Sequence, residues 1–380
     1  QIRQDQERGE PMKALGDTAV AGGGIGAWHR ECPHGCSATL AADGTGAIIA
    51  HAQDLCVFAC LLKDRATFDK IGQIRCLGLR AMGADLAASY PAARAVFDEV
   101  DEALGQKLST LIWDGAQETL TLTENAQPAL MATSLAALRA LEAEGVDLSK
   151  AASHVAGHSL GEYSALAAAG AISVADTARL LRIRGQAMQQ AVPVGIGAMA
   201  ALLGLDFETA RTIAQEAAEG EVCQAANDND PAQVVISGHK SAVERAVELA
   251  KARGAKRAML LPVSAPFHCA LMAPAADVMA QALSEVAIRA PAVPLVANVR
   301  AQAVTDPAEI RALLVEQVTG SVRWRESVQY MEAQGVTEIW EIGAGKALSG
   351  MVRRIARDLA CRTIGTSDEV AAAMASLTAN

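Results

Sequence analysis

The stretch Gly157-His158-Ser159-Leu160-Gly161 has the pattern Gly-x-Ser-x-Gly. A short apolar run precedes it over residues 151–156, and a helix-forming run follows it over residues 162–169. This order of strand, sharp turn and helix is typical of a nucleophile elbow, in which a strained turn lifts a serine hydroxyl off the end of a strand. Glycine is favoured on both sides of the serine because side chains there would clash with the turn. The pattern predicts that Ser159 is a nucleophile, and a turn around a buried structural serine is the alternative.

The composition indicates a globular α/β protein. Of the 380 residues, 51% are hydrophobic and 20% are charged, so a large core can form and extensive disorder is excluded. The net charge of −10, with no dominant basic block, argues against a nucleic-acid partner. No apolar run reaches membrane-spanning length and no secretory signal opens the sequence. We therefore expect no membrane partner and a cytoplasmic protein whose cysteines are reduced.

Residues 1–67 differ from the rest, and we expect them to form an atypical extension that is weakly ordered or foreign to the mature protein. Only residues 47–62 are apolar enough to form an element, and their periodicity is poor. Metal-ligating side chains cluster in this part of the chain, namely Cys32, His34, Cys36, Cys56 and Cys60. Because their spacings do not match a paired Cys-x-x-Cys framework, we expect no bound metal.

Strands and helices alternate over most of the remaining chain, which predicts a parallel sheet with helices on both faces. Helices are expected over residues 84–104 (interrupted at Pro91), 129–144, 173–193, 271–286, 308–318, 325–334 and 347–359. Strands are expected over residues 151–156, 293–298 and 337–342.

Residues 195–262 have a different order of elements. Strand-like segments cover residues 198–205, 222–226, 233–237 and 256–261, and helical segments cover residues 207–220 and 241–253. The order β-α-β-β-α-β is the ferredoxin-like signature. We therefore predict an α/β fold in which a large, α/β-hydrolase-like domain (residues 68–194 and 263–380) carries an inserted small ferredoxin-like domain (residues 195–262).

A serine nucleophile needs a general base, and His268 is the first candidate. It lies in an irregular, proline-flanked segment at the return to the large domain, where loops of a cleft are expected. His158 ranks second, because a side chain directly beside a nucleophile usually points away from it. A structural histidine is the alternative for either residue.

The residues around Ser159 resemble the signature of the malonyl-CoA:acyl carrier protein transacylases. The matching stretch is Gly157-His158-Ser159-Leu160-Gly161-Glu162-Tyr163-Ser164-Ala165. Other stretches agree with the family in order and spacing: Gln127-Pro128-Ala129, Arg184-Gly185, Gly197-Ala198-Met199-Ala200, Gln233-Val234-Val235-Ile236-Ser237-Gly238, His268-Cys269-Ala270-Leu271-Met272 and Gly343-Ala344-Gly345-Lys346. The resemblance covers residues 82–380, and it is specific because the motifs are spread through the chain.

This resemblance implies ping-pong acyl transfer. Ser159 attacks the thioester of malonyl-CoA with His268 as base, and the malonyl group of the serine ester then passes to the phosphopantetheine thiol of acyl carrier protein. The family match implies that the Gln317 backbone carbonyl orients His268. It also implies that Arg184 pairs with the malonyl carboxylate, which a guanidinium group binds bidentately. Without the family match, an exposed helix charge is favoured for Arg184.

The same resemblance assigns further residues to the substrate cleft. Phe267 matches the phenylalanine of malonyl-selective members, whose bulk excludes a 2-methyl branch. His158, Asn227 and Asn298 match polar positions near the substrate.

The oxyanion hole of the family combines two backbone N–H groups. One belongs to the residue after the nucleophile, which is Leu160 here. The other belongs to a glutamine in an N-terminal glycine-rich loop, and only Gly72-Gln73 corresponds to that loop in this chain. Gln73 is therefore the expected second donor, and because the loss of one such donor costs roughly a hundredfold in rate, a catalytically impaired homologue that still binds carrier protein is an alternative.

The expected partners are malonyl-CoA and acyl carrier protein, bound by a monomer. No cofactor is expected, because the coenzyme A thioester and the phosphopantetheine are substrates. Carrier protein is acidic, so docking needs a basic patch; two clusters qualify, Lys251, Arg253, Lys256 and Arg257, or Arg353, Arg354 and Arg357. Alternative functions are an acyltransferase of malonate decarboxylation or polyketide synthesis, and a serine esterase.

Overall fold

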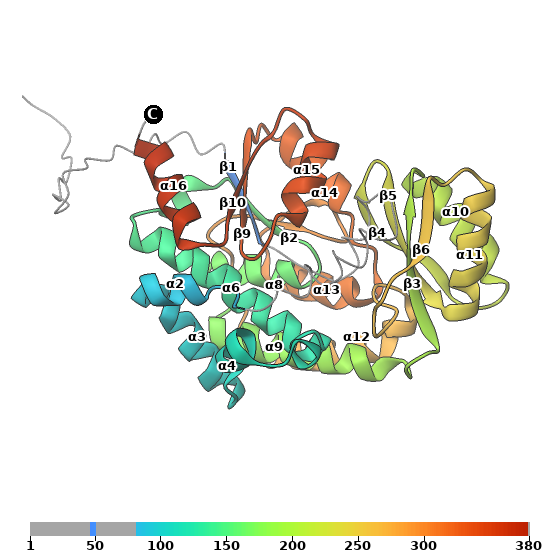
Figure 1. Ribbon diagram of the computed structural model, residues 1–380, viewed down its shortest axis with the longest axis horizontal. Helices are drawn as coiled ribbons and strands as arrows, with labels where there is room; N and C mark the ends of the chain where they lie inside the picture. The colour runs from blue at the N-terminus through green and yellow to red at the C-terminus, as the bar shows by residue number, and fades with distance from the viewer. Residues whose placement is uncertain (1–45, 51–80, 379–380) are drawn as a thin grey trace, which may run out of the picture. The chain divides into compact units, whose positions relative to one another are not determined.

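The computed structural model describes residues 46–50 and 81–378 (Figure 1). Its larger sheet has six strands in the order β10-β9-β1-β2-β7-β8. Their bounds are β1 Gly46–Ala50, β2 His154–Gly157, β7 Leu295–Ala297, β8 Gln302–Val304, β9 Glu338–Ile342 and β10 Ala360–Ile364. The first five strands in this order are parallel, as predicted for this sheet, and β8 is an antiparallel edge strand on β7.

Most of the longer helices around this sheet match the expected ranges, whereas α4, α5, α7 and α16 have no counterpart among them. Their bounds are α2 Ala84–Ser89, α3 Pro91–Leu104, α4 Leu108–Asp114, α5 Gln117–Leu120, α6 Thr123–Ala143, α7 Leu148–Ala151, α8 Leu160–Ala168, α9 Val174–Ala191, η1 Ala270–Met272, α12 Ala273–Ser284, α13 Pro307–Thr319, α14 Trp324–Ala333, α15 Ala347–Ile355 and α16 Ser367–Thr378. The predicted break at Pro91 separates α2 from α3. None of the helices in the described ranges is long and apolar enough to cross a membrane.

The strand β1 lies in a segment that the sequence assigns to the extension over residues 1–67. It pairs in parallel with β2 on one side and with β9 on the other, so it occupies the middle of the sheet. A central strand of a parallel sheet is covered on both faces and therefore lacks the alternation of polar and apolar residues that marks a half-exposed strand. The lack of alternation within β1 is consistent with this position.

The strands of the larger sheet place alternate residues into two cores. Val155 and Leu295 belong to the core formed with α6 and α8, whereas Ala156 and Val296 belong to the core formed with α14 and α15. The two helix pairs therefore cover opposite faces of the sheet (Figure 1). This arrangement brings the carboxyl end of β2 to the amino end of α8, where the predicted nucleophile lies.

The second sheet contains four antiparallel strands in the order β4-β5-β3-β6. Its elements are β3 Gly197–Leu203, α10 Phe207–Ala218, β4 Cys223–Asp230, β5 Gln233–His239, α11 Lys240–Ala252 and β6 Arg257–Leu260, which follow the predicted order β-α-β-β-α-β. The helices α10 and α11 pack together on one face of this sheet (Figure 1).

Two buried carboxylates on β4 join the small sheet to the helices of the larger one. Asp228 pairs with Arg325 of α14 at 2.8 Å, and Asp230 pairs with Arg354 just before the end of α15 at 2.7 Å. Both aspartates are at most 2% exposed. Because an unpaired buried carboxylate is costly, these pairs fix β4 against the larger domain and close to the elbow.

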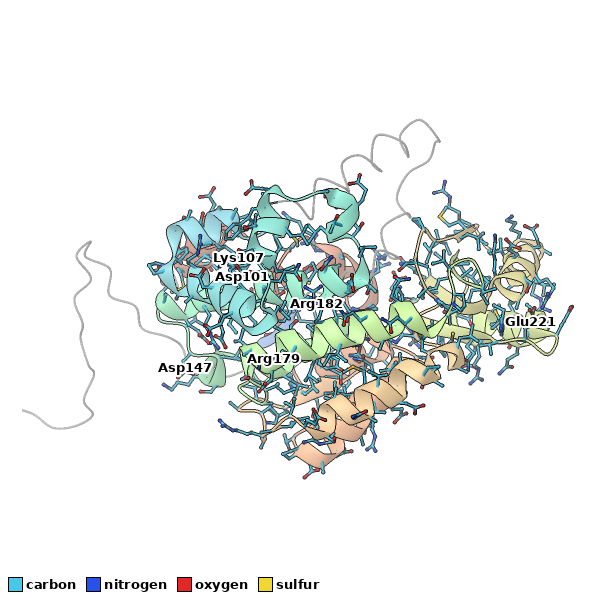
Figure 2. The ribbon with its side chains drawn as sticks, turned by 90° about the horizontal axis from the view of Figure 1, so that it is seen from below. Asp101, Lys107, Asp147, Arg179, Arg182 and Glu221 are labelled. Carbon is cyan, nitrogen blue, oxygen red and sulfur yellow. The ribbon has the colours of Figure 1, made fainter. Side chains whose placement is uncertain are left out.

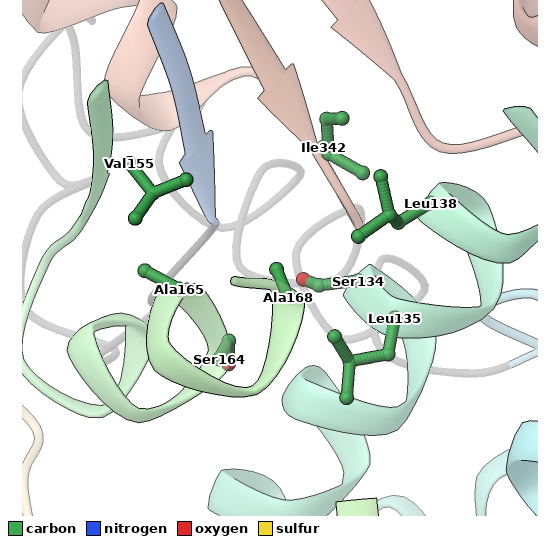
Figure 3. A pocket seen from close by; sticks show the side chains of 8 residues that line it. All are labelled: Ser134, Leu135, Leu138, Val155, Ser164, Ala165, Ala168 and Ile342. Carbon is green, nitrogen blue, oxygen red and sulfur yellow. The ribbon is translucent and has the colours of Figure 1, made fainter. Parts of the chain in front are cut away.

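A small cavity lies in the core between the larger sheet and its helices (Figure 3). It is lined mainly by apolar side chains: Leu135, Leu138, Val155, Ala165, Ala168 and Ile342, with Ser134 and Ser164. Its volume of about 10 Å³ is that of a single water-sized sphere, far too small for an acyl group. This cavity is part of the packed core and not a substrate site.

Candidate active site

Ser159 forms a strained turn between β2 and α8. Its backbone angles are φ 55° and ψ −113°, which lie outside the regions that residues other than glycine normally adopt. The turn is so tight that a Cβ atom on Gly157 would lie 2.0 Å from the carbonyl of Gly161. Gly157 therefore allows the close approach that the sequence pattern predicts, and the serine lies at the amino terminus of α8.

Asn298, just after β7, braces this turn. Its side-chain Oδ1 accepts the backbone N–H of Ser159 at 2.7 Å, and its Nδ2 donates to the backbone carbonyl of Gly157 at 2.7 Å. All of these groups are buried. One amide therefore pairs a donor and an acceptor that the strained backbone would otherwise leave unsatisfied.

His268 approaches the serine from the segment that precedes η1. Its Nε2 lies 2.8 Å from the Ser159 hydroxyl, and its Nδ1 lies 2.9 Å from the backbone carbonyl of Gln317 in α13. The carbonyl can only accept, so Nδ1 carries a proton and Nε2 is left as the acceptor for the serine O–H. The backbone of His268 is itself in the left-handed region, at φ 59°.

Arg184 reaches the same hydroxyl from α9. Two other arginines of this helix, Arg179 and Arg182, lie on its outer side, where they bind Asp176 and Asn125 (Figure 2). The side chain of Arg184, by contrast, is fully buried. Its Nη2 donates to Ser159 Oγ at 3.0 Å and to Gln317 Oε1 at 2.9 Å, and its Nη1 donates to Gln127 Oε1 at 2.8 Å. The exposed-charge alternative for Arg184 is therefore wrong.

The contact between Arg184 and Gln127 depends on close packing of α9 against α6. A Cβ atom on Gly185 would lie 2.5 Å from the Cα of Glu124, so only glycine allows the two helices to approach this far. The helix predicted over residues 129–144 in fact begins at Thr123, and Gln127 lies in its second turn. The sequence motif contained Gln127, but only the structure gives it a partner.

The sequence alone assigns no role to Glu162 or to the side-chain amide of Gln317. Glu162 Oε2 accepts from Gln317 Nε2 at 2.7 Å and from the backbone N–H of Asn298 at 3.2 Å. Gln317 Nε2 also donates to the backbone carbonyl of Ser159 at 2.9 Å. Burial raises the pKa of Glu162 to about 7, against the opposing effects of these hydrogen bonds and of the Arg184 charge. The one feature of the sequence that could have pointed to Glu162 is its position three residues after the nucleophile.

The other predicted residues lie around this group. His158 is directed toward Asn229 of β4, with Nε2 and Oδ1 2.9 Å apart, and its ring lies against Trp324. It therefore does not take the place of the base. Phe267 and Asn227 are both buried, and neither makes a side-chain hydrogen bond with the Ser159 group in the ranges that the structure describes. Leu160 is the first residue of α8, so its backbone N–H has no partner within the helix.

The predicted second oxyanion donor and the clustered cysteine and histidine residues near the amino terminus lie in parts of the chain that the structure does not describe. Gln73 lies outside the described residues, and so do Cys32, His34, Cys36, Cys56 and Cys60. Within residues 46–50 and 81–378, no group of three or more histidine, cysteine or acidic side chains is arranged to hold a metal ion.

Comparison with known proteins gives one consistent result. The family model described as "Acyl transferase domain" matches residues 79–365. The malonyl CoA-acyl carrier protein transacylase of Escherichia coli K12 is 48% identical over 293 residues, which cover 77% of this chain and 94% of that protein. The crystal structure of an acyl-carrier-protein-S-malonyltransferase from Bartonella henselae superimposes with a TM-score of 0.79 at 51% identity, covering 87% of this chain and 99% of that one.

A second solved structure contains a partner. It is a malonyl-transacylase in complex with its type II PKS acyl-carrier protein, and the similarity has a TM-score of 0.78 at 39% identity over 87% of this chain and 99% of that one. The matched segment contains Ser159, Arg184, His268 and Gln317. The chain therefore belongs to the acyl transferase domain family and, within it, to the malonyl CoA-acyl carrier protein transacylases.

Proposed function

We propose that this protein transfers the malonyl group of malonyl-CoA to the phosphopantetheine thiol of acyl carrier protein through a malonyl ester of Ser159. The observation that carries the proposal is the convergence of His268 and Arg184 on one hydroxyl, at 2.8 Å and 3.0 Å from Ser159 Oγ. The first contact supplies a base for a nucleophile. The second supplies a buried cation for an acyl group that carries its own carboxylate.

Acylation of the serine follows from these contacts. His268 Nε2 takes the hydroxyl proton of Ser159 as the oxygen attacks the thioester carbonyl, and the imidazolium is stabilised through its Nδ1–H by the Gln317 carbonyl. The negative oxygen of the tetrahedral intermediate receives the Leu160 N–H at the positive end of α8. Collapse of the intermediate breaks the carbon–sulfur bond, and His268 returns the proton to the departing thiolate of coenzyme A.

Deacylation reverses these steps with a different thiol. His268 deprotonates the phosphopantetheine thiol, whose sulfur attacks the ester carbonyl, and the proton returns to Ser159 as the serine leaves. Arg184 binds the free carboxylate throughout and exchanges its contact with Ser159 Oγ for two contacts with that group. The reaction consumes neither oxidant nor metal, so we propose that no cofactor takes part.

The surroundings of His268 favour a transferase over a serine esterase. An Asp or Glu on Nδ1 would complete a triad of the esterase type, and here Nδ1 meets a backbone carbonyl. The carrier protein is less constrained, because the similar malonyl-transacylase in complex with a type II PKS acyl-carrier protein makes a polyketide carrier a second candidate beside that of fatty acid synthesis.

We also propose a domain description for this activity. The larger sheet with its helices acts as an α/β-hydrolase-like domain (residues 68–194 and 263–380, joined by β1), and residues 195–262 form an inserted ferredoxin-like domain. The strand order β4-β5-β3-β6, which places the first and third strands of the insertion at the centre, supports the second assignment.

The docking site for the acidic carrier protein is proposed at Arg353 and Arg357. Neither forms an ion pair with a described residue, whereas Arg354 between them pairs with Asp230. In the competing cluster, Lys251 pairs with Glu248 and Arg253 pairs with Glu216. The variant Arg357→Glu should raise KM for carrier protein and leave KM for malonyl-CoA unchanged. The same result from Arg253→Glu, without an effect of Arg357→Glu, would move the site to the other cluster.

Labelling with radioactive malonyl-CoA tests the proposed function. We expect a stable malonyl ester on Ser159 that carrier protein discharges within the turnover time and water discharges slowly. The Ser159→Ala variant should remain unlabelled. Rapid hydrolysis without transfer to the thiol would instead identify an esterase.

A further inference from the structure

Glu162 is a buried carboxyl group directly behind the nucleophile, with 1% of its surface exposed. It contacts no hydroxyl or imidazole of the proposed catalytic pair. Its Oε2 accepts two N–H groups, one from the backbone of Asn298 and one from the side chain of Gln317. Burial of an ionised carboxylate costs free energy unless a positive group lies nearby to compensate its charge.

The compensating group is Arg184, to which Glu162 is joined by a single amide. The amide of Gln317 donates from Nε2 to Glu162 at 2.7 Å and accepts at Oε1 from Arg184 at 2.9 Å. The amide dipole is therefore aligned between a negative and a positive group, which strengthens both hydrogen bonds. The other hydrogen-bond partners of Arg184 are neutral, and it forms no direct salt bridge within the described residues.

We propose that Glu162 is the counter-charge of Arg184 in the unloaded enzyme, acting through the Gln317 amide, and that it takes up a proton when the carboxylate of the acyl group pairs with Arg184. Glu162 is thus a positioning residue that touches no reacting atom. The inference rests on the proposed function, because the malonyl group supplies the carboxylate. The proton comes from solvent, and no covalent bond is formed between Glu162 and the substrate.

The electrostatic balance around Glu162 explains the direction of this exchange. Burial raises the pKa of Glu162 to about 7, and the charge of Arg184 is one of the effects that lower it. An acyl carboxylate on Arg184 offsets that lowering effect, because it places a second negative charge near Glu162. The pKa of Glu162 then rises further, so the carboxyl group becomes protonated near neutral pH.

Few other titratable groups surround Glu162. Tyr163 follows it on α8, lies 5.7 Å from the Arg184 guanidinium and has its pKa raised by burial, so it stays neutral. His268 is separated from Glu162 by Gln317 and Ser159, which it contacts. The groups that contact the Glu162 carboxyl are uncharged: the side-chain amide of Gln317 from α13 and the backbone N–H of Asn298 just after β7.

The proton uptake can be measured by titration calorimetry on the full chain in buffers of different ionisation enthalpy. The Ser159→Ala background prevents turnover, and acetyl-CoA is the matched probe because it lacks only the carboxylate. At a pH of about 7.5 we expect malonyl-CoA to take up about half a proton or more beyond acetyl-CoA. The Kd of malonyl-CoA should weaken about tenfold between pH 6 and pH 8, and that of acetyl-CoA should show no such additional loss.

The variant Glu162→Gln in the same background should abolish the excess uptake and flatten the pH profile, because its amide keeps an acceptor for Gln317 but cannot titrate. Glu102→Gln, an exposed change on α3, should preserve both. Equal uptake for the two thioesters, or excess uptake that persists in Glu162→Gln, would overturn the inference while leaving the proposed function intact. If Glu162→Gln fails to fold, the comparison of the two thioesters decides alone. Absence of any malonyl-CoA binding would overturn the proposed function itself.

Discussion

Asn298 holds the backbone of Ser159 from 139 positions further along the chain, with its Oδ1 2.7 Å from the serine N–H. Because the serine N–H already donates to Asn298, it is not available to bind an oxyanion in the reaction. The Leu160 N–H, at the first helical position of α8, is therefore the donor that the elbow itself can offer to an oxyanion. The same contact fixes a backbone conformation that the chain would otherwise avoid.

Replacement of Asn298 by Ala should therefore affect stability and acylation together. It leaves the Ser159 N–H and the Gly157 carbonyl buried without partners, at a cost of about 1–3 kcal/mol for each group. We expect a loss of about 2–6 kcal/mol in the free energy of unfolding, measured with urea, and slower acylation in single-turnover assays. Asn125→Ala is the matched control, since this buried residue also makes two hydrogen bonds but lies away from the elbow. A similar loss of acylation in both variants would contradict the specific role of Asn298.

His268→Ala should lower the acylation rate by roughly a hundredfold to ten-thousandfold, the usual contribution of a positioned general base. The double variant with Ser159→Ala should be no slower than the serine variant alone, because the two groups act as one unit. His154→Ala is the control: this half-buried histidine contacts Ser153 and the ring of Tyr330, outside the proposed site. Additive losses in the double variant would argue that His268 acts elsewhere in the cycle.

Arg184→Ala should change the choice of acyl group and not only the rate. We expect malonyl transfer to fall while the relative use of acetyl-CoA rises, with the ratio of the two kcat/KM values shifting by roughly ten- to a hundredfold, as for a hydrogen bond to a charged group. The outer-face variant Arg182→Ala should leave the ratio unchanged. Equal losses for both thioesters would show that Arg184 serves the chemistry common to both.

Glu162 should also make the stability of the free protein depend on pH. Its pKa in the folded state is raised to about 7 from an ordinary value of 4.5. The unfolded chain therefore binds fewer protons between these values, and stability is full below the lower one and falls as pH rises through the upper one. Relative to Glu162→Gln, the wild type should lose on the order of 3 kcal/mol between pH 4.5 and pH 8. Urea unfolding at both ends of this range measures the difference, and a constant difference would exclude a titrating Glu162.

The ion pair between Asp228 and Arg325 should be costly to break from one side. Arg325→Ala leaves a carboxylate that is almost fully buried and should cost about 3 kcal/mol in the free energy of unfolding. The double variant with Asp228→Asn should be more stable than Arg325→Ala alone, because the uncompensated charge is gone. The exposed pair of Arg94 and Asp98 is the control, and removal of either partner should cost less than about 1 kcal/mol.

The sequence predicted the longer helices, the elements of the insertion and the strands β2, β7 and β9, but it missed β8, β10 and α16. It also predicted the site residues whose signals are local. Ser159 is marked by flanking glycines, and Arg184 and His268 belong to family motifs in which the order along the chain is preserved. The resemblance was needed for Arg184, since a lone arginine on a helix with Arg179 and Arg182 carries no sign of which side chain turns inward.

Residues that act through partners far along the chain could not be assigned from the sequence. Glu162 lies inside the recognised motif, yet its role depends on Gln317, 155 positions away. Gln127 similarly depends on the contact between α6 and α9. The strand β1 was missed for a different reason: a central parallel strand is recognised by its neighbours in the sheet and not by alternation along its own sequence.

Gly185 lies in a helix interface and still influences which acyl group the site selects. Its missing side chain lets α9 lie against the backbone of Glu124, and this approach brings Gln127 within reach of Arg184. A single methyl group at this position would separate two helices and retune the guanidinium without altering any atom that meets the acyl chain. An apolar substitution in the helix interface can therefore change the selectivity of this enzyme. Mutagenesis restricted to residues that line the substrate cleft would miss such a position.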